Sequence, residues 1–101
     1  MIYSIEFLRR ARLELLEAWE WYEDKQIGLG DKFKHQADIC IRAVEKNPER
    51  YPERRRNYRE GIVKGFPYLI IYRIHKRRNT IAIVSVFHTS RSPRRKYTRQ
   101  V

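Results

Sequence analysis

The sequence has 101 residues, a formal net charge of +11, 42% hydrophobic residues and one cysteine, Cys40. This length fits one domain, residues 1–101, with one modest core. A single cysteine excludes an internal disulfide, and no apolar run reaches the ~20 residues that a membrane-spanning helix needs. The first residues lack the basic segment of a secretory signal. Together these features predict a cytoplasmic protein that does not enter a membrane.

The charge is divided unevenly between the two halves of the chain. Residues 1–47 carry 8 Lys or Arg and 9 Asp or Glu, whereas residues 48–101 carry 15 and 3. The net charges are therefore −1 and +12, so the whole excess lies in the second half. Such a field attracts a polyanion, either nucleic acid or an acidic protein. The alternative is a solvated basic surface without a fixed partner.

The chain is expected to begin with a strand and a long helix. Residues 2–6 favour a strand because isoleucine and tyrosine dominate the run. An apolar stripe with helical spacing follows. The stripe consists of Leu8, Ala11, Leu15, Ala18 and Tyr22. Most charged residues of this segment, Glu14 among them, are expected off the stripe, and Trp21 is expected to point outward.

A second helix is expected after a short connection. Gly28 and Gly30 are predicted to break the first helical pattern, and Asp31 is predicted to cap the next helix. The second stripe consists of Phe33, Ala37, Cys40, Ile41 and Val44. The helix stops before Pro48, because the residue before proline avoids the α region. Two adjacent helices with a short connection form an antiparallel hairpin, in which Cys40 is interpreted as a small buried residue.

The second half of the chain is predicted to form the sheet. Residues 48–57 are polar and contain two prolines, so we expect an irregular segment there. Three strands follow, at residues 58–64, 66–74 and 80–87. The basic tail, residues 92–101, is expected to be poorly ordered when the chain is alone. The prediction is an α+β fold of order β-α-α-β-β-β, with a helical hairpin packed on one face of an antiparallel sheet.

Three residues of the second half could carry out chemistry: His88, Arg73 and Arg91. RNA cleavage by 2′-hydroxyl attack needs no metal, but it needs groups that move protons and cations that stabilise the phosphate. Histidine titrates near neutral pH, which suits proton transfer. Each candidate also has a structural interpretation. His88 could be a hydrogen-bonded histidine at a strand end, and Arg73 could pair with Glu60.

Alternation along a regular strand predicts that His88 shares a face with Val86 and Val84. No group of His, Cys, Asp or Glu has metal-ligand spacing, so neither a metal site nor a cofactor is expected. Ten basic residues are candidates for binding nucleic acid or a target protein. They are Arg54, Arg55, Arg56, Arg59, Lys76, Arg77, Arg78, Arg94, Arg95 and Lys96.

Several short motifs, in order along nearly the whole chain, resemble those of the RelE/ParE superfamily of bacterial toxins. They are Trp21-Tyr22-Glu23, Gly28-Leu29-Gly30, Asn47-Pro48, Tyr51-Pro52, Gly65-Phe66-Pro67-Tyr68, Val86-Phe87-His88 and Arg91-Ser92-Pro93. The sequence is most similar to the ParE-like branch, which serves in plasmid stabilisation. The resemblance implies a toxin of a type II toxin–antitoxin system, with an acidic antitoxin as its partner.

The branches of this superfamily imply different targets. ParE-like members poison DNA gyrase, whereas RelE-like members cleave messenger RNA on the ribosome. In this chain Thr89 stands where the RelE-type catalytic arginine would fall, which favours growth arrest through gyrase. A metal-independent, ribosome-dependent endoribonuclease is the second interpretation, and the question of enzyme or binder stays open. A non-toxic basic domain that binds nucleic acid is the third.

Overall fold

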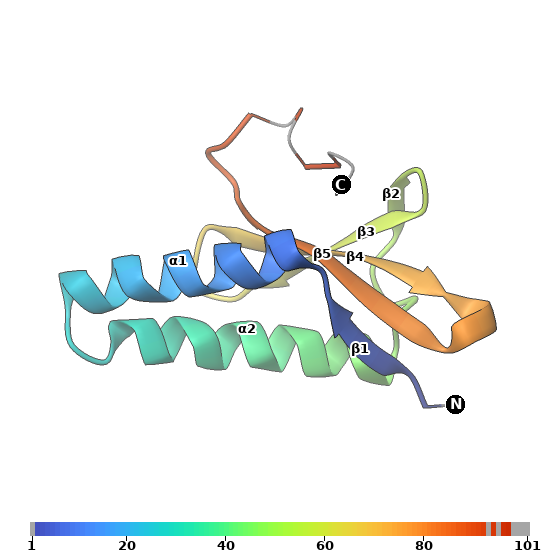
Figure 1. The fold of residues 1–101 in the computed structure, drawn as a ribbon, viewed down its shortest axis with the longest axis horizontal. Helices are drawn as coiled ribbons and strands as arrows, with labels where there is room; N and C mark the ends of the chain where they lie inside the picture. Colours follow the sequence, from blue (N-terminus) through green and yellow to red (C-terminus); the bar gives the residue numbers. More distant parts are fainter. Residues whose placement is uncertain (1, 93, 95, 98–101) are drawn as a thin grey trace.

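The computed structural model describes residues 2–92, 94, 96 and 97 and shows one α+β unit (Figure 1). Its elements are β1 (Ser4–Phe7), α1 (Arg9–Lys25), α2 (Leu29–Lys46), β2 (Glu53–Arg55), β3 (Tyr58–Val63), β4 (Tyr68–His75), the short 3-10 helix η1 (Lys76–Arg78) and β5 (Thr80–His88). The predicted class and order are confirmed, with β2 as an additional strand. None of the helices in the described part is long and apolar enough to cross a membrane.

The sheet has five strands in the order β1-β5-β4-β3-β2. The pairs from β2 to β5 are antiparallel, as expected, but β1 pairs with β5 in parallel, with Ser4 opposite Thr80. The sheet is therefore mixed rather than wholly antiparallel. The helical hairpin connects β1 at one edge of the sheet to β2 and β3 at the opposite edge (Figure 1).

The helical hairpin is held together at its turn by the side chain of Glu23. Its carboxylate accepts hydrogen bonds from the backbone N–H groups of Gly28 and Gly30, at 2.9 Å each. Backbone N–H groups at a helix start lack partners within the helix, so Glu23 caps α2. The prediction that Asp31 is the cap is wrong, because α2 already begins at Leu29. Asp31 instead accepts a bond from Trp19 Nε1 at 2.9 Å.

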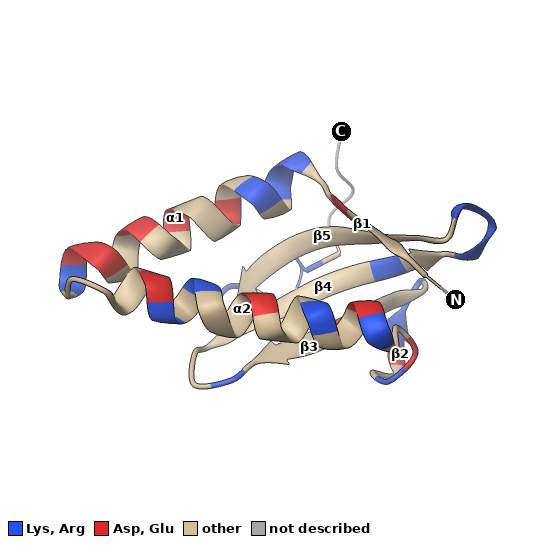
Figure 2. Ribbon diagram, turned by 90° about the horizontal axis from the view of Figure 1, so that it is seen from below, with Lys and Arg blue, Asp and Glu red and all other residues tan. Residues whose placement is uncertain are grey.

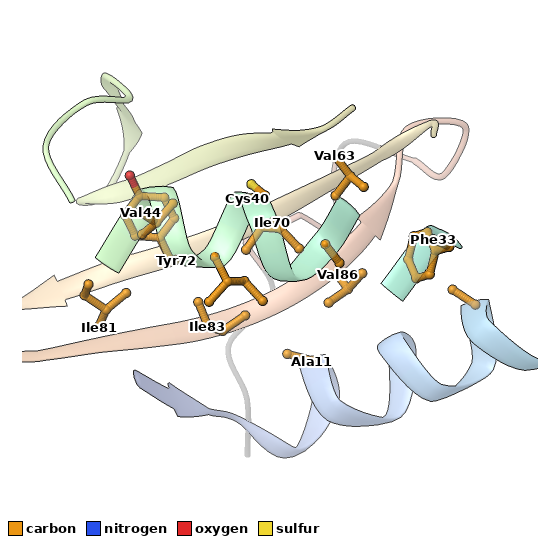
Figure 3. Close-up of a cluster of buried hydrophobic side chains, with 13 residues drawn as sticks. Ala11, Phe33, Cys40, Val44, Val63, Ile70, Tyr72, Ile81, Ile83 and Val86 are labelled. Carbon is orange, nitrogen blue, oxygen red and sulfur yellow. The ribbon is translucent and has the colours of Figure 1, made fainter. Parts of the chain in front are cut away.

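The main core lies between the helices and one face of the sheet (Figure 3). Phe33 and Val44 of α2 are fully buried against Ile70, Tyr72 and Ile83 of the central strands. The hydroxyl of Tyr72 donates a 2.7 Å hydrogen bond to the backbone oxygen of Pro48, which ties the end of the α2 connection to the sheet. Cys40 is buried in the same cluster, which confirms its interpretation as a core residue.

A second, smaller cluster lies on the sheet face opposite the helices, which we call the outer face. Tyr58, Ile71, Val84 and Phe87 are buried there, and Tyr97 of the tail packs against them. The Tyr97 ring stacks on Tyr58, while the expected disorder of the tail stays a prediction. Residues 93, 95 and 98–101 of the expected tail lie outside the described residues.

Two local features differ from the sequence prediction. Residues 53–55, expected to be irregular, form β2 and turn into β3 through Arg56 and Asn57, whose φ angles are 52° and 70°. Two consecutive residues with positive φ make the type of two-residue turn whose twist matches a hairpin. In β5, Ile83 is opposite Tyr72 and Ser85 is opposite Ile71, so Val84 is an extra residue.

This bulge changes which side chains share a face. Val84 belongs to the cluster on the outer face, whereas His88 and Val86 line a groove beside α1. The prediction that His88 shares a face with Val84 is wrong, because it assumed unbroken alternation. The prediction that His88 shares a face with Val86 is confirmed.

Candidate functional site

The end of β5 is fastened to α1 by a buried carboxylate, Glu14. Only 8% of Glu14 is exposed, and its Oε1 accepts hydrogen bonds from Ser85 Oγ at 2.7 Å and from the Val86 backbone N–H at 3.0 Å. Its Oε2 lies 3.3 Å from Arg10 Nε and 3.2 Å from Arg91 Nη1. The expectation that Glu14 lies off the buried stripe is wrong. The bulge in β5 explains its position, because it presents Ser85 and Val86 to the helix.

A groove of about 560 Å³ lies beside this carboxylate, between α1 and the ends of β4 and β5. Trp21, Tyr22 and Tyr68 form aromatic walls, and His88 and Arg91 lie at its polar end. Burial raises the pKa of Tyr22 and of Tyr68, so both phenols stay protonated near neutral pH. Trp21 is 56% exposed, which confirms that it points outward.

His88 is held in this groove by the turn that follows it. Its Nδ1 accepts a hydrogen bond from the backbone N–H of Ser90 at 3.0 Å and lies 2.7 Å from Ser90 Oγ. The ring packs edge-on against Tyr68, with centroids 4.9 Å apart. Because Nδ1 accepts from a backbone N–H, the neutral ring carries its proton on Nε2. The nitrogen that remains is a donor, whereas a general base needs a free acceptor.

Arg91 follows His88 at the mouth of the groove. Its Nη1 is paired with Glu14, although 45% of the side chain is exposed. Part of its charge is therefore neutralised inside the protein, and the side chain also lines the groove. The structure thus brings His88 and Arg91 into one groove.

Arg73 lies on the other face of the sheet. It pairs in register with Tyr58, and its guanidinium lies 5.2 Å from the centre of the Tyr58 ring. Its buried Nε has no hydrogen-bond partner among the described residues. Glu60, the expected ion-pair partner, instead accepts a hydrogen bond from the Tyr97 hydroxyl and pairs with Lys96 at 3.4 Å. A hollow of about 410 Å³ surrounds Arg73, with Tyr58, Tyr97, Arg56 and His75 among its lining residues.

The predicted binding residues gather at the end of the molecule opposite the helical turn. A hollow of about 560 Å³ there is lined by Arg59, by all three residues of η1 and by Glu53. Figure 2 shows the Lys and Arg of η1 at one end and the acidic residues of α1 toward the other. This hollow shares Asn57 and His75 with the hollow around Arg73, so the two adjoin.

A third, smaller hollow of about 150 Å³ extends this surface to the tail. It is lined by Arg55, Arg56, Arg94 and Tyr97. We call the combined surface the basic corner. It consists of Arg55, Arg56, Arg59, Lys76, Arg77, Arg78 and Arg94. Arg54 lies exposed on the adjoining β2, Lys96 is paired with Glu60, and Arg95 lies outside the described residues.

The sequence prediction missed the roles of two carboxylates that organise these surfaces, Glu14 and Glu60. Glu14 had a visible signal, because it falls between Ala11 and Ala18 at helical spacing on the buried side. Glu60 had none, because its role depends on where the tail lies. Among the described residues, no three His, Cys, Asp or Glu side chains gather closely enough to hold a metal ion.

The comparisons with known proteins agree with this architecture. A family model described as the ParE toxin of the type II toxin–antitoxin system parDE matches residues 5–93. A solved structure titled as the chromosomal ParDE toxin–antitoxin system from P. aeruginosa superposes with a TM-score of 0.75. The two chains are 13% identical, and the match covers 88% of this chain and 98% of that one. A search of curated protein sequences gives no match.

Proposed function

We propose that this chain, which belongs to the ParE toxin family of type II toxin–antitoxin systems, arrests growth by binding DNA gyrase rather than by cleaving RNA. Family membership implies an antitoxin as partner. The target and the mode of action are the proposal. In this proposal the basic corner supplies the binding surface, and the residues considered for catalysis serve the fold and the groove beside α1.

One observation carries the proposal: the three candidate catalytic residues lie on two faces of the sheet. His88 and Arg91 line the groove beside α1, whereas Arg73 lies in the hollow on the outer face. A nuclease needs its proton-transfer groups and its phosphate-binding cation around one phosphate. His88 and Arg91 also have internal partners in Ser90 and Glu14. This arrangement supports a binding protein more than a nuclease.

The antitoxin is proposed to be acidic and to approach the same basic corner. Eight of the predicted binding residues are placed there or beside it, and Glu53 is the one carboxylate among the residues lining the large hollow. Charge complementarity of this kind accelerates association and selects the partner. Binding of target and binding of antitoxin would then exclude one another, which is what neutralisation requires.

One observation favours the second candidate, a ribosome-dependent endoribonuclease. Arg73 has a buried Nε without a hydrogen-bond partner among the described residues, and Tyr97 lines the same hollow. A phosphate could satisfy that N–H group. In that case the catalytic centre is on the outer face, around Arg73, and His88 has no part in it.

Inducible expression in a bacterial host separates these candidates. Messenger RNA ends are mapped by primer extension and gyrase-linked DNA breaks are measured in the same culture. The proposal predicts DNA breaks with intact messages for the natural chain and for His88→Ala. It predicts loss of arrest when Arg77 and Arg78 are both changed to Glu.

The matched control places the same two charge reversals at Arg9 and Arg12, which are exposed near the start of α1. New messenger RNA ends within minutes, absent in Arg73→Gln, would replace the proposal with the nuclease. Expression that does not slow growth at all would favour the third interpretation, a non-toxic domain that binds nucleic acid.

A further inference from the structure

Two neighbouring turns at one end of the sheet carry a high density of positive charge. Residues 53–59 and 75–79, which include these turns, contain seven Lys or Arg and one Glu. Figure 2 shows both turns at the end of the molecule away from the connection between the helices. Five exposed cations stand on the turns themselves. We call them the basic loops: Arg55 and Arg56 of the β2–β3 turn, and Lys76, Arg77 and Arg78 of η1.

The cations of the basic loops have no carboxylate partner within the described part of the chain. The ion pairs found there join Glu14, Asp38 and Glu60 to cations elsewhere. Glu53 is the one carboxylate that lines the hollow beside η1, and in the strand register it lies opposite Arg59 rather than a loop residue. Exposed cations held close together repel one another, so an anionic ligand would be stabilised between them.

Hydrogen bonds fix the two loops in their conformations. In η1, the Asn79 backbone N–H donates to the Lys76 oxygen at 3.2 Å, and the Thr80 hydroxyl donates to the Arg78 oxygen at 3.0 Å. The β2–β3 turn has two central residues with positive φ, the conformation of a tight hairpin. Both loops are short and are anchored in a strand on each side, so little backbone entropy is lost when a ligand binds.

The hollow of about 560 Å³ beside these loops has few apolar residues. No Phe, Tyr or Trp is among its described lining residues, and Ile74 is its one aliphatic residue. Protein interfaces draw most of their affinity from side chains buried in packed pockets, aromatic ones above all. Single-stranded nucleic acids rely on bases that stack on aromatic rings. Contacts with the phosphates of a duplex need cations alone, so these loops favour a duplex as the ligand.

The spacing of the loops agrees with a ligand that has two rows of phosphates. β3 and β4 are neighbours in the sheet, so the two turns lie about two strand spacings apart, ~10 Å. The grooves of B-DNA are about 6 and 12 Å wide and separate the phosphates of its two strands by comparable distances. Each loop can therefore contact a different strand of one duplex.

We propose that the basic loops bind the phosphates of a DNA duplex, with the β2–β3 turn on one strand and η1 on the other. The choice of DNA over RNA rests on the proposed function, because DNA gyrase acts on DNA. The contact with phosphates rests on the loops alone. The consequence for the proposed function is that the toxin recognises the DNA that gyrase holds. An acidic antitoxin would then compete with DNA for the same cations.

The test is the salt dependence of DNA binding by the full chain, produced in a cell-free system. Binding to a fluorescein-labelled DNA duplex of about 20 base pairs is measured by fluorescence anisotropy between 50 and 200 mM KCl. Five phosphate contacts predict a slope of log K against log salt of about −4.5, which is about a 500-fold loss of affinity over this range. A slope shallower than about −2, or no binding at 50 mM KCl, would overturn the proposal.

Matched variants separate the basic loops from the net charge of the chain. Arg77→Gln combined with Arg78→Gln removes two contacts and is expected to reduce the slope to about −2.7. Arg55→Gln combined with Arg56→Gln should have the same effect. The control, Arg9→Gln combined with Lys32→Gln, removes the same charge from exposed positions on α1 and α2 and should keep the natural slope. An equal reduction in the control would overturn the proposal. Urea midpoints verify that each variant is folded.

Two further ligands test the assignment to duplex DNA. An RNA duplex of the same sequence and the single DNA strand are both expected to bind more weakly. Equal or tighter binding of either would overturn the assignment.

The cellular experiment stays separate from this one. Gyrase-linked breaks in culture without DNA binding in solution would overturn this inference and leave the proposed function standing. DNA binding in solution without breaks in culture would do the reverse.

Discussion

Replacement of Glu14 by alanine tests how the groove and the end of β5 are held. The substitution removes the acceptor from two buried donors, Ser85 Oγ and the Val86 backbone N–H. Each unsatisfied donor costs about 1–3 kcal/mol. The side chain of Arg91 is 45% exposed and can turn to water, so its ion pair adds little. Arg10 is only 17% exposed, so the loss of its partner adds to the cost. For the two donors together the expected loss of stability is about 2–6 kcal/mol.

Urea unfolding, followed by circular dichroism, measures this loss from the shift in midpoint at constant slope. For a domain of this size each kcal/mol lowers Tm by about 4–8 °C, so the same loss lowers Tm by at least about 8 °C. Glu14→Gln retains one acceptor oxygen and should lose about half as much. Glu17→Ala, on the exposed side of the same helix, is the control and should change stability by less than ~0.5 kcal/mol. If Glu14→Ala loses no more than Glu17→Ala, the carboxylate does not fasten β5 to α1.

Three further predictions follow from local geometry. In Gly30→Ala the new Cβ would lie 2.6 Å from the Trp19 backbone oxygen, so urea unfolding should show a loss of about 1–3 kcal/mol; an unchanged midpoint would mean that the helices separate freely. Arg56→Gly relieves the strain of the left-handed backbone at this position, so the urea midpoint should rise or stay the same while binding at the basic corner weakens. A lower midpoint would show that the backbone of Arg56 is not strained. Burial raises the pKa of Tyr72 from 10.0 to about 12, so folding favours its neutral form. Stability is then fully present below pH 10 and declines as pH rises toward 12, and Tyr72→Phe, which loses the bond to Pro48, should show a shallower decline in urea midpoint over that range.

The helices and the central strands could be predicted because their side chains repeat with a regular period. The stripe of α2 illustrates this: Phe33, Ala37 and Val44 recur at helical spacing, and all three are fully buried. The run Tyr68–His75 is apolar enough to indicate a central strand, and it lies between two others. In such elements burial is decided locally, so a pattern in the sequence is sufficient.

The remaining features depend on contacts between distant segments. The bulge at Val84 could not be predicted from the sequence around it, which alternates normally. The bulge accompanies a contact with a distant segment, the hydrogen bond from the Val86 backbone N–H to Glu14 on α1. The position of Tyr97 depends on its contacts with Glu60 and Tyr58 of β3. The placement of the catalytic candidates on two faces of the sheet depends on the bulge. The whole-chain resemblance indicated the family. It did not indicate which residues come together in a site, because that depends on these contacts.

The place of β5 in the sheet has a consequence for synthesis on the ribosome. It is the last strand of the described chain, yet it lies between β1 and β4 and contacts α1. The first strand therefore has no partner until residues 80–83 have emerged, and every earlier nascent chain lacks the strand that joins β1 to β4. Pairings between such distant segments form late and slowly. An incomplete chain accordingly lacks the complete sheet, so both faces of the sheet form only after translation has passed the end of β5.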